Sequence, residues 1–206
     1  GAFRSAGQKC TATSRIIVER PIYDEFIALL AEGTTRLKVG HALDEGTYLG
    51  PVATNEQYRT VSGFANLART AGRTLAEAPI PENADGYYLS PMVVEGVEPD
   101  HPLAREEIFG PLAVALPAED EEEAIGLCNR SAFGLSASVF TRNVRSALRF
   151  LEEAEAGMVR VNQETAGVEY QAPFGGMKES GSHSREQGQA ALEFYTAVKT
   201  CSIAYG

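Results

Sequence analysis

Hydrophobic positions in the first third of the chain follow a strand period and then a helix period. The run Ser14-Arg15-Ile16-Ile17-Val18-Glu19 is short and β-branched, which predicts a strand. From Pro21 onward apolar residues recur at helical spacing, and proline is well tolerated in the first turn of a helix. A second helix is predicted over residues 55–71, because the helical period stops at Gly72. The first helix is expected to bury one face, made of Ile22, Phe26, Leu29 and Leu30.

The rest of the chain alternates strand and helix patterns joined by short links. The patterns predict, in order, an extended segment at 87–97, a strand at 111–119, a helix at 120–129, a strand at 135–141, a helix at 143–157 and a strand at 158–162. Such alternation is typical of an α/β fold with a mostly parallel sheet flanked by helices. We therefore expect one domain over residues 1–197, followed by a protruding C-terminal strand at 198–206.

Composition narrows the class of protein. The chain has 206 residues, 44% of them hydrophobic, which suits one globular domain with a sizeable core. Its net charge of -10 disfavours nucleic acid or an anionic membrane as a partner. No apolar run reaches the length of a membrane span, and no signal peptide pattern opens the chain. Three widely spaced cysteines without a C-x-x-C pair indicate a reducing compartment, so we expect a cytoplasmic protein without disulfides.

Several catalytic motifs are absent from the sequence. No two glycines lie two residues apart, which excludes a G-x-G-x-x-G dinucleotide loop, and neither a P-loop nor a G-x-S-x-G elbow occurs. His41, His101 and His183 have no metal-binding spacing with one another or with a cysteine, so no metal site is expected. P-loop enzymes, metal hydrolases and serine hydrolases of the elbow type are thereby excluded.

Cys10 differs from the other two cysteines. Cys128 lies on an apolar helix face and Cys201 alternates along the final strand, so both are expected to be buried in the core or the sheet. Cys10 follows Gly7-Gln8-Lys9 and precedes small polar residues, with no local apolar period. A nearby cation or backbone N–H groups would activate such a thiol, but its local context also permits an incidental thiol.

Two further segments have both a functional and an ordinary interpretation. In Glu106-Glu107-Ile108-Phe109-Gly110-Pro111, the carboxylates either are solvated at a strand entrance or hold a sugar hydroxyl of a nucleotide. In Pro173-Phe174-Gly175-Gly176-Met177-Lys178-Glu179-Ser180-Gly181, the glycines indicate either a close backbone approach or a simple surface turn. Each segment alone is a weak signal.

Taken in order, these segments resemble the aldehyde dehydrogenase family over essentially the whole chain. The matching residues are Gly7-Gln8-x-Cys10, Glu106-Glu107-x-Phe109-Gly110-Pro111, Pro173-Phe174-Gly175-Gly176-x-Lys178-x-Ser180-Gly181 and Arg185-Glu186-x-Gly188, with Tyr195-Thr196 and Val198-Lys199 near the end. Three family-specific motifs in the family's order make a chance match very improbable. The resemblance favours the nucleophile interpretation of Cys10.

The resemblance implies a reaction and a cofactor. The Cys10 thiolate would attack an aldehyde carbonyl to form a thiohemiacetal, with the backbone N–H of Cys10 stabilising the oxyanion. Hydride would pass to NAD or NADP, and water would hydrolyse the thioester to the carboxylic acid. Glu107 matches the carboxylate that holds the nicotinamide ribose, and Phe109 would pack beside the same half of the cofactor.

The resemblance also assigns substrate and assembly residues. Lys9 and Thr11 would flank the nucleophile at the mouth of the site, and Val168 and Phe174 match positions that line the substrate tunnel. The segment 198–206 matches the family's oligomerisation strand, which implies a homo-dimer or tetramer in the full-length protein.

One departure from the family concerns what precedes Cys10. In the family the nucleotide-binding domain, the general-base glutamate and the oxyanion-hole asparagine all come before the nucleophile, whereas this chain starts nine residues before Cys10. We therefore expect a catalytic-domain fragment that is largely inactive alone and that exposes the surface around Cys10 and Glu107.

The substrate and the reaction class leave alternatives open. The segment 181–189, with its insertion Ser182-His183-Ser184, resembles the α-ketoglutaric semialdehyde (2,5-dioxopentanoate) dehydrogenases, so the expected substrate is a small-molecule semialdehyde. Arg4 and Lys9 are candidate cations for its carboxylate. The alternatives are a cysteine hydrolase with a histidine base, a CoA-acylating aldehyde dehydrogenase and an inactive folded assembly module.

Overall fold

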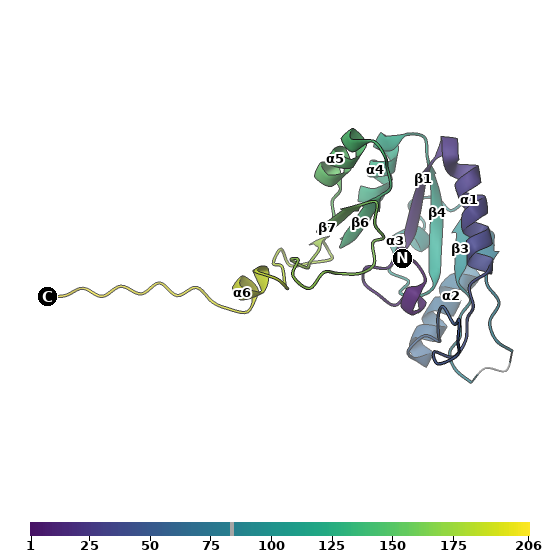
Figure 1. Cartoon of the computed structure of the whole chain (residues 1–206), viewed down its shortest axis with the longest axis horizontal. Helices are drawn as coiled ribbons and strands as arrows, with labels where there is room; N and C mark the ends of the chain where they lie inside the picture. The colour runs from purple at the N-terminus through teal and green to yellow at the C-terminus, as the bar shows by residue number, and fades with distance from the viewer. Residues whose placement is uncertain (83–84) are drawn as a thin grey trace.

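The chain forms a four-stranded sheet flanked by helices, with α5, β6, β7 and α6 to one side of it (Figure 1), as described for residues 1–82 and 85–206 by a computed structural model. The strands are β1 (Arg15–Glu19), β2 (Arg73–Glu77), β3 (Met92–Glu95), β4 (Leu112–Ala118), β5 (Phe133–Gly134), β6 (Ser136–Val139), β7 (Met158–Val161) and β8 (Met177–Lys178). The helices are η1 (Arg4–Gly7, 3-10), α1 (Arg20–Thr35), α2 (Asn55–Ala71), α3 (Pro102–Arg105), α4 (Glu121–Asn129), α5 (Val144–Glu153) and α6 (Ala190–Phe194). Within the described residues, no helix is long and apolar enough to cross a membrane.

The central sheet has the strand order β1-β4-β3-β2. β4 pairs in parallel with both β1 and β3, whereas β2 is antiparallel to β3 at the edge. Two smaller sheets follow, with β6 parallel to β7 and β5 antiparallel to β8. The expected α/β architecture with a mostly parallel sheet is therefore confirmed, and β2 is an added strand that the hydrophobic pattern does not predict.

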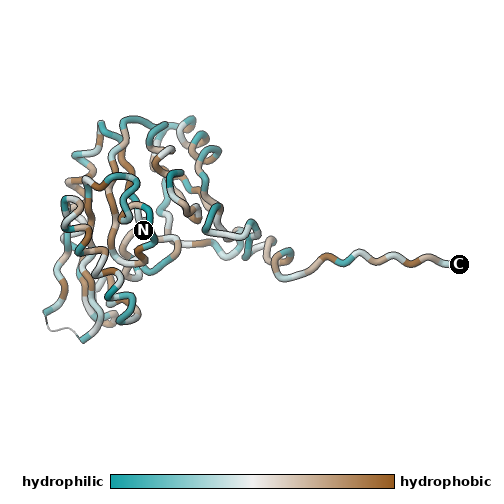
Figure 2. Tube along the Cα trace, turned by 180° about the vertical axis from the view of Figure 1, so that it is seen from behind, coloured by the Kyte–Doolittle hydropathy of each residue, from teal (hydrophilic) through white to brown (hydrophobic). Residues whose placement is uncertain are grey.

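Strand β4 lies at the centre of the fold because both of its faces are apolar. Six of its seven residues are buried. Leu112, Val114 and Leu116 join a core formed with α2, α3 and α4, while Ala113 and Ala115 join a core formed with α1 on the opposite face. Figure 2 shows hydrophobic positions concentrated in these strands. Helices on both faces exclude water from the sheet, which explains the nearly continuous hydrophobic run in β4.

The buried face of α1 differs from the expected one. Tyr23 and Ile27 are buried, whereas Ile22 and Leu29 are 54% and 62% exposed. The sheet presents small residues to this helix, which leaves room for the ring of Tyr23, and its hydroxyl donates a hydrogen bond of 2.8 Å to Glu95. A tyrosine ring buries a large apolar area while its hydroxyl keeps a polar partner, so packing decided the rotation of the helix.

The C-terminal segment 196–206 extends away from the domain (Figure 1). Val198 and Tyr205 are 99% and 92% exposed, and the segment pairs with no strand among the described residues. Cys201 is exposed here, so its expected burial is wrong for this chain. Pairing of residues 198–206 as an oligomerisation strand stays a prediction.

Candidate active site

A cavity of about 300 Å³ lies at the amino ends of β1, β4 and β6. Lys9 and Cys10 reach it from the loop before β1, and Glu107 and Phe109 reach it from the loop before β4. A volume of this size suits a small-molecule site. The structure therefore brings together four of the residues singled out in the sequence, although they come from segments almost one hundred positions apart.

The loop that carries Cys10 has an unusual backbone. Ser5, Ala6 and Gly7 have φ angles of 56°, 54° and 68°, all in the left-handed region. The backbone N–H of Ala12 donates to the carbonyl of Lys9 at 2.9 Å, which closes a turn around Cys10. The Cys10 side chain is exposed, and its own backbone N–H has no acceptor within the described part of the chain. An unshared N–H beside a thiol is a suitable donor to a developing oxyanion.

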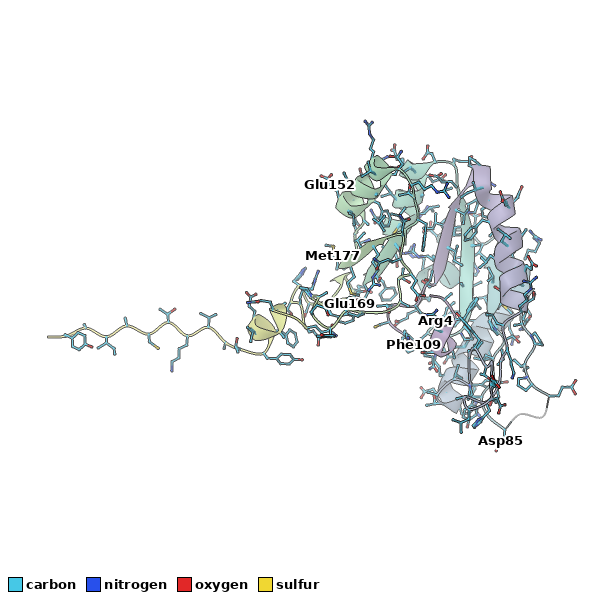
Figure 3. All side chains as sticks on the ribbon, viewed as in Figure 1. Arg4, Asp85, Phe109, Glu152, Glu169 and Met177 are labelled. Carbon is cyan, nitrogen blue, oxygen red and sulfur yellow. The ribbon has the colours of Figure 1, made fainter. Side chains whose placement is uncertain are left out.

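Gly7 brings this loop against the Glu107 segment. A Cβ atom on Gly7 would lie 2.1 Å from the carbonyl oxygen of Gly110, so the two backbones are in direct contact. Figure 3 labels Arg4 and Phe109, which mark the two segments. Only glycine permits this approach. Close packing therefore brings the Gly-Gln-x-Cys and Phe-Gly-Pro motifs together, although they are distant in sequence.

Gln57 of α2 holds the Glu107 segment from the other side. Its side-chain amide donates to the carbonyls of Ile108 and Phe109, at 3.1 and 2.8 Å. Phe109 has a φ of 52°, an uncommon value for a residue other than glycine. The two hydrogen bonds hold this bend, and Glu107 and Phe109 are both exposed at the cavity.

Gln57 and Gln8 have positioning roles that the sequence does not reveal. The side-chain oxygen of Gln8 accepts from the N–H of Ala53 at 2.9 Å, which fastens the Cys10 loop to the segment before α2. No local sequence pattern links either glutamine to its partner. The Gln8 contact spans 45 positions, and the two Gln57 contacts span 51 and 52. The one local signal is that Gln57 follows the helix cap Thr54 by three residues and so lies in the first turn of α2.

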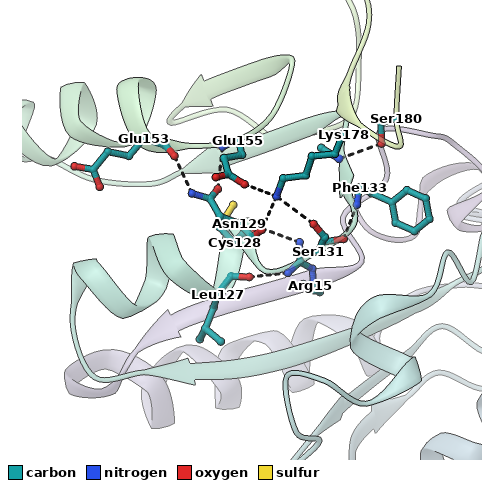
Figure 4. A network of polar contacts seen from close by, with 11 residues as sticks. Arg15, Leu127, Cys128, Asn129, Ser131, Phe133, Glu153, Glu155, Lys178 and Ser180 are labelled. Atoms are coloured by element: carbon teal, nitrogen blue, oxygen red, sulfur yellow. Dashed lines mark hydrogen bonds and ion pairs between the residues drawn. The ribbon is translucent and has the colours of Figure 1, made fainter. Parts of the chain in front are cut away.

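Two cations cap the C-terminal end of α4, whose last residues Cys128 and Asn129 form another wall of the cavity (Figure 4). The Arg15 guanidinium donates to the carbonyls of Leu127 and Cys128 at 2.7 and 3.1 Å, and burial lowers the pKa of Arg15. The Lys178 ammonium donates to the carbonyls of Asn129 and Ser131 and forms an ion pair with Glu155. Positive charge at a helix C-terminus satisfies unpaired carbonyls and complements the helix dipole.

Replacing Lys178 with methionine should lower the free energy of unfolding by about 2 kcal/mol, because two carbonyls lose a charged donor. Urea denaturation measures the change. Lys199→Met in the exposed C-terminal segment is the matched control and should change the free energy by less than about 0.5 kcal/mol. Equal effects of the two variants would show that the cap contributes nothing to stability.

The glycine-rich segment before and after Lys178 is a tight loop, as the functional interpretation of its glycines predicts. A Cβ on Gly157 would lie 1.9 Å from the carbonyl oxygen of Gly175, and a Cβ on Gly176 would lie 2.4 Å from Cβ of Ser180. The hydroxyl of Ser180 accepts from the N–H of Gly134 at 3.1 Å. The loop therefore packs its backbone directly onto the strands beside the cavity, which places Lys178 at the end of α4.

Cys128 is half-buried in the wall of the same cavity, and burial raises the pKa of its thiol. The folded protein thus holds this proton more tightly than the unfolded chain, in which a thiol ionises near about pH 8.5. The free energy of unfolding should therefore fall as the pH rises above that value. Cys128→Ala should reduce the fall in denaturation curves between about pH 7 and about pH 9.5, whereas the exposed Cys201→Ala should not. Identical pH slopes for both variants would show that the raised pKa of Cys128 does not cause the fall in the free energy of unfolding.

Other residues singled out in the sequence lie outside the cavity lining. Thr11 is buried, with 4% of its surface exposed, and Val168 and Phe174 are half-buried beyond the lining. Hydrogen bonds connect the Cys10 loop to the segment before Val168: Thr13 with Thr165 at 2.7 Å, and Arg4 with Glu164 at 3.0 Å. Substrate roles for Thr11, Val168 and Phe174 stay predictions.

The geometry does not support a cysteine–histidine pair. His41, His101 and His183 all lie outside the lining of the cavity that contains Cys10. The Nδ1 atoms of His41 and His101 instead accept backbone N–H groups two residues ahead, each at 3.2 Å. Within the described part of the chain, no group of three His, Cys, Asp or Glu residues is arranged to hold a metal ion.

Comparison with known proteins gives one consistent family. Residues 1–201 match the family model described as "Aldehyde dehydrogenase family". The chain is 45% identical to an alpha-ketoglutaric semialdehyde dehydrogenase from Bacillus subtilis, over 98% of this chain and 42% of the relative. It is 37% identical to a 2,5-dioxopentanoate dehydrogenase from Saccharolobus solfataricus, over 97% of this chain and 42% of that protein. The chain thus spans about two fifths of the length of these curated relatives.

Solved structures agree with the sequence matches. A putative aldehyde dehydrogenase from Burkholderia cenocepacia superposes with a TM-score of 0.91 at 35% identity, over 98% of this chain and 42% of that one. A betaine aldehyde dehydrogenase from Staphylococcus aureus, solved in complex with NAD+, superposes with a TM-score of 0.88 at 32% identity, over 94% of this chain and 39% of that one.

Proposed function

Because this chain belongs to the aldehyde dehydrogenase family, we propose that it supplies the nucleophile and part of the cofactor surface for oxidation of an aldehyde to a carboxylic acid. The observation that carries the proposal is that Cys10, Glu107 and Phe109 meet at one cavity. The Cys10 sulfur would bond to the aldehyde carbon, and the resulting oxyanion would accept the unshared backbone N–H of Cys10.

The residues beside Cys10 fit a nicotinamide cofactor. Glu107 presents a carboxylate suited to ribose hydroxyls, and Phe109 presents an aromatic ring to the same side of the cavity. NAD or NADP would accept the two electrons and hydrogen lost by the substrate. Gln57 would keep both side chains in place, since it holds the two carbonyls of that bend.

The 206 residues by themselves should turn over little or no substrate. The relatives that carry the named activities are more than twice as long, and this chain matches 42% of each. We propose that the remaining length supplies the nucleotide-binding domain and the general base of the hydrolytic step. An inactive assembly module is therefore the alternative description of the chain in isolation.

The proposed substrate is a semialdehyde such as 2,5-dioxopentanoate, as in the relatives from Bacillus subtilis and Saccharolobus solfataricus. Lys9 lies at the cavity and forms no ion pair among the described residues, so it can offer positive charge to a substrate carboxylate, whereas Arg4 lies near its loop and is paired with Glu164. A cationic aldehyde would be repelled by Lys9.

A hybrid enzyme tests the substrate, with this chain replacing the matching 42% of the Bacillus subtilis relative. NAD(P)H formation is followed with 2,5-dioxopentanoate and with betaine aldehyde. We expect kcat/KM to be at least about tenfold higher for the semialdehyde, because Lys9 at the cavity would attract a substrate carboxylate and repel a cation. A preference for betaine aldehyde would overturn the substrate assignment. A rate that requires CoA and yields an acyl-CoA would favour the CoA-acylating alternative.

Self-association should depend on residues 198–206. Their exposed apolar side chains have no cover within the described chain, and an extended segment of this kind can add a strand to a second copy. Light scattering should show dimers or tetramers for the full chain and monomers after deletion of 198–206. The same mass for the full chain and the deletion variant would contradict the role of residues 198–206 as an oligomerisation strand.

A further inference from the structure

A second and larger cavity, of about 800 Å³, lies at the opposite end of the central sheet from Cys10. The Cys10 cavity is at the amino ends of β1 and β4, whereas this one is bounded by residues that follow their carboxyl ends. Arg20 follows β1, Glu119 follows β4 and Gly96 follows β3. None of the residues assigned to the proposed reaction lines it.

The cavity lies at a topological switch point of the sheet. β1 and β4 are neighbouring parallel strands, but the chain leaves them toward opposite faces. After β1 it enters α1, which packs on the face of Ala113 and Ala115. After β4 it enters α4, whose Leu127 belongs to the core on the other face. In open α/β sheets, ligands bind in the crevice that such a divergence leaves at the carboxyl ends of the strands.

We propose that this cavity binds a small organic cation with a short aliphatic body. Its walls include the apolar side chains of Ile27, Leu75, Val97 and Leu116, which suit a hydrocarbon chain. Its charged groups suit an ammonium, because the cations in the cavity are paired and carboxylates are left without an ion-pair partner among the described residues.

The positive side chains in the cavity are already neutralised. Arg20 donates to Glu119 at 2.8 Å, and Arg73 forms an ion pair with Glu95. Among the described residues, no cation pairs with Asp24 or Glu98, which line the same cavity, and Glu123 accepts the backbone N–H of Glu119 at 2.6 Å but has no ion-pair partner. The charged groups that remain available to a ligand are therefore carboxylates.

Tyr23 completes the polar part of the site without adding charge. Its hydroxyl donates to Glu95, and burial raises the pKa of this phenol, so it stays protonated at neutral pH. Glu95 is thereby held by both Tyr23 and Arg73 at the side of the cavity nearest β2 and β3. An anionic ligand would meet an excess of negative charge, whereas an amine would meet ion-pair partners.

Butane-1,4-diammonium is the probe, with butane-1,4-diol and butanedioate of the same length as neutral and anionic comparisons. Titration of the 15N-labelled chain should give saturable NMR shifts at α1 and at residues 96–99, with a Kd on the order of 1 mM or tighter. The diol and the dicarboxylate should give no saturable shift there. Absence of saturation with the diammonium, or equal binding of the diol, would overturn the proposal.

Two neighbouring positions on α1 supply a matched pair of variants. Asp24 lines the cavity and Glu25 does not, although both are exposed carboxylates on the same helix. Asp24→Asn should weaken diammonium binding by roughly fivefold, whereas Glu25→Gln should leave it unchanged. Equal weakening by the two variants would mean that the probe responds to net charge alone, and the proposed site would be wrong.

The binding experiment does not depend on the proposed reaction. It requires neither NAD(P) nor turnover, and Cys10→Ser should leave the diammonium Kd unchanged because Cys10 lines the other cavity. A catalytic role for Cys10 can therefore fail while this site is confirmed, and the reverse also holds.

Discussion

Cys10→Ser should lower NAD(P)H formation by the hybrid enzyme by roughly 10⁴-fold or more, the loss typical when a covalent nucleophile is removed. Serine keeps the size and the turn around Cys10, so the backbone contacts of the loop should be retained. The loss should therefore appear in kcat rather than in stability. Steady-state assays with 2,5-dioxopentanoate, together with thermal denaturation of each variant, measure both quantities.

The other two cysteines provide the controls. Cys128 lines the same cavity but is half-buried at the end of α4, and Cys201 is exposed in the C-terminal segment. Cys201→Ser should retain the full rate, and Cys128→Ser should retain most of it. If Cys128→Ser lost activity to this extent while Cys10→Ser stayed active, the nucleophile would be Cys128 and the assignment of Cys10 would be wrong.

Gly7→Ala should lower the free energy of unfolding by about 3 kcal/mol or more, with a loss of activity in the folded fraction. The added Cβ would lie 2.1 Å from the carbonyl oxygen of Gly110 and 2.9 Å from the nitrogen of Pro111, both of them backbone atoms. The φ of 68° adds strain, since residues with a side chain avoid the left-handed region. Relief of the overlap requires the Cys10 loop to move away from the Glu107 segment. Urea denaturation and the hybrid assay should both detect that movement.

Gly126→Ala is the matched control for this substitution. Gly126 is an exposed residue of α4, and a Cβ there would meet nothing within 4 Å. Alanine at such a position should stabilise the chain by about 0.5 to about 1 kcal/mol, because it favours the helix. If Gly7→Ala is no more destabilising than Gly126→Ala, the close approach of the two backbones does not exist in solution.

Much of the fold follows from local patterns. Helix α2 occupies Asn55–Ala71 as the hydrophobic period and Gly72 predict, and α4 begins after Asp120, whose side chain accepts the N–H of Glu123. The continuous apolar run of β4 likewise predicts a strand with both faces covered. These features depend on residues within a few positions of one another, which is why the sequence is sufficient for them.

The edge strand β2 and the orientation of α1 could not be predicted in the same way. β2 is held by pairing with β3 almost twenty positions later, and its own residues show no clean alternation. The rotation of α1 depends on space beside Ala113 and Ala115 and on a hydrogen-bond partner for Tyr23. Both outcomes rest on contacts between segments that are distant in sequence.

The sequence by itself determined which family the chain resembles, the order of its main strands and helices, and Cys10, Glu107 and Phe109 as the residues to examine. Those conclusions need residue identity and spacing, which the chain carries locally. Only the tertiary structure decided that the Cys10 loop touches the Glu107 segment through Gly7 and Gly110, and that Gln57, Arg15 and Lys178 hold the surrounding walls. Close packing sets these contacts, because backbones and carbonyls from distant segments become partners when the sheet forms.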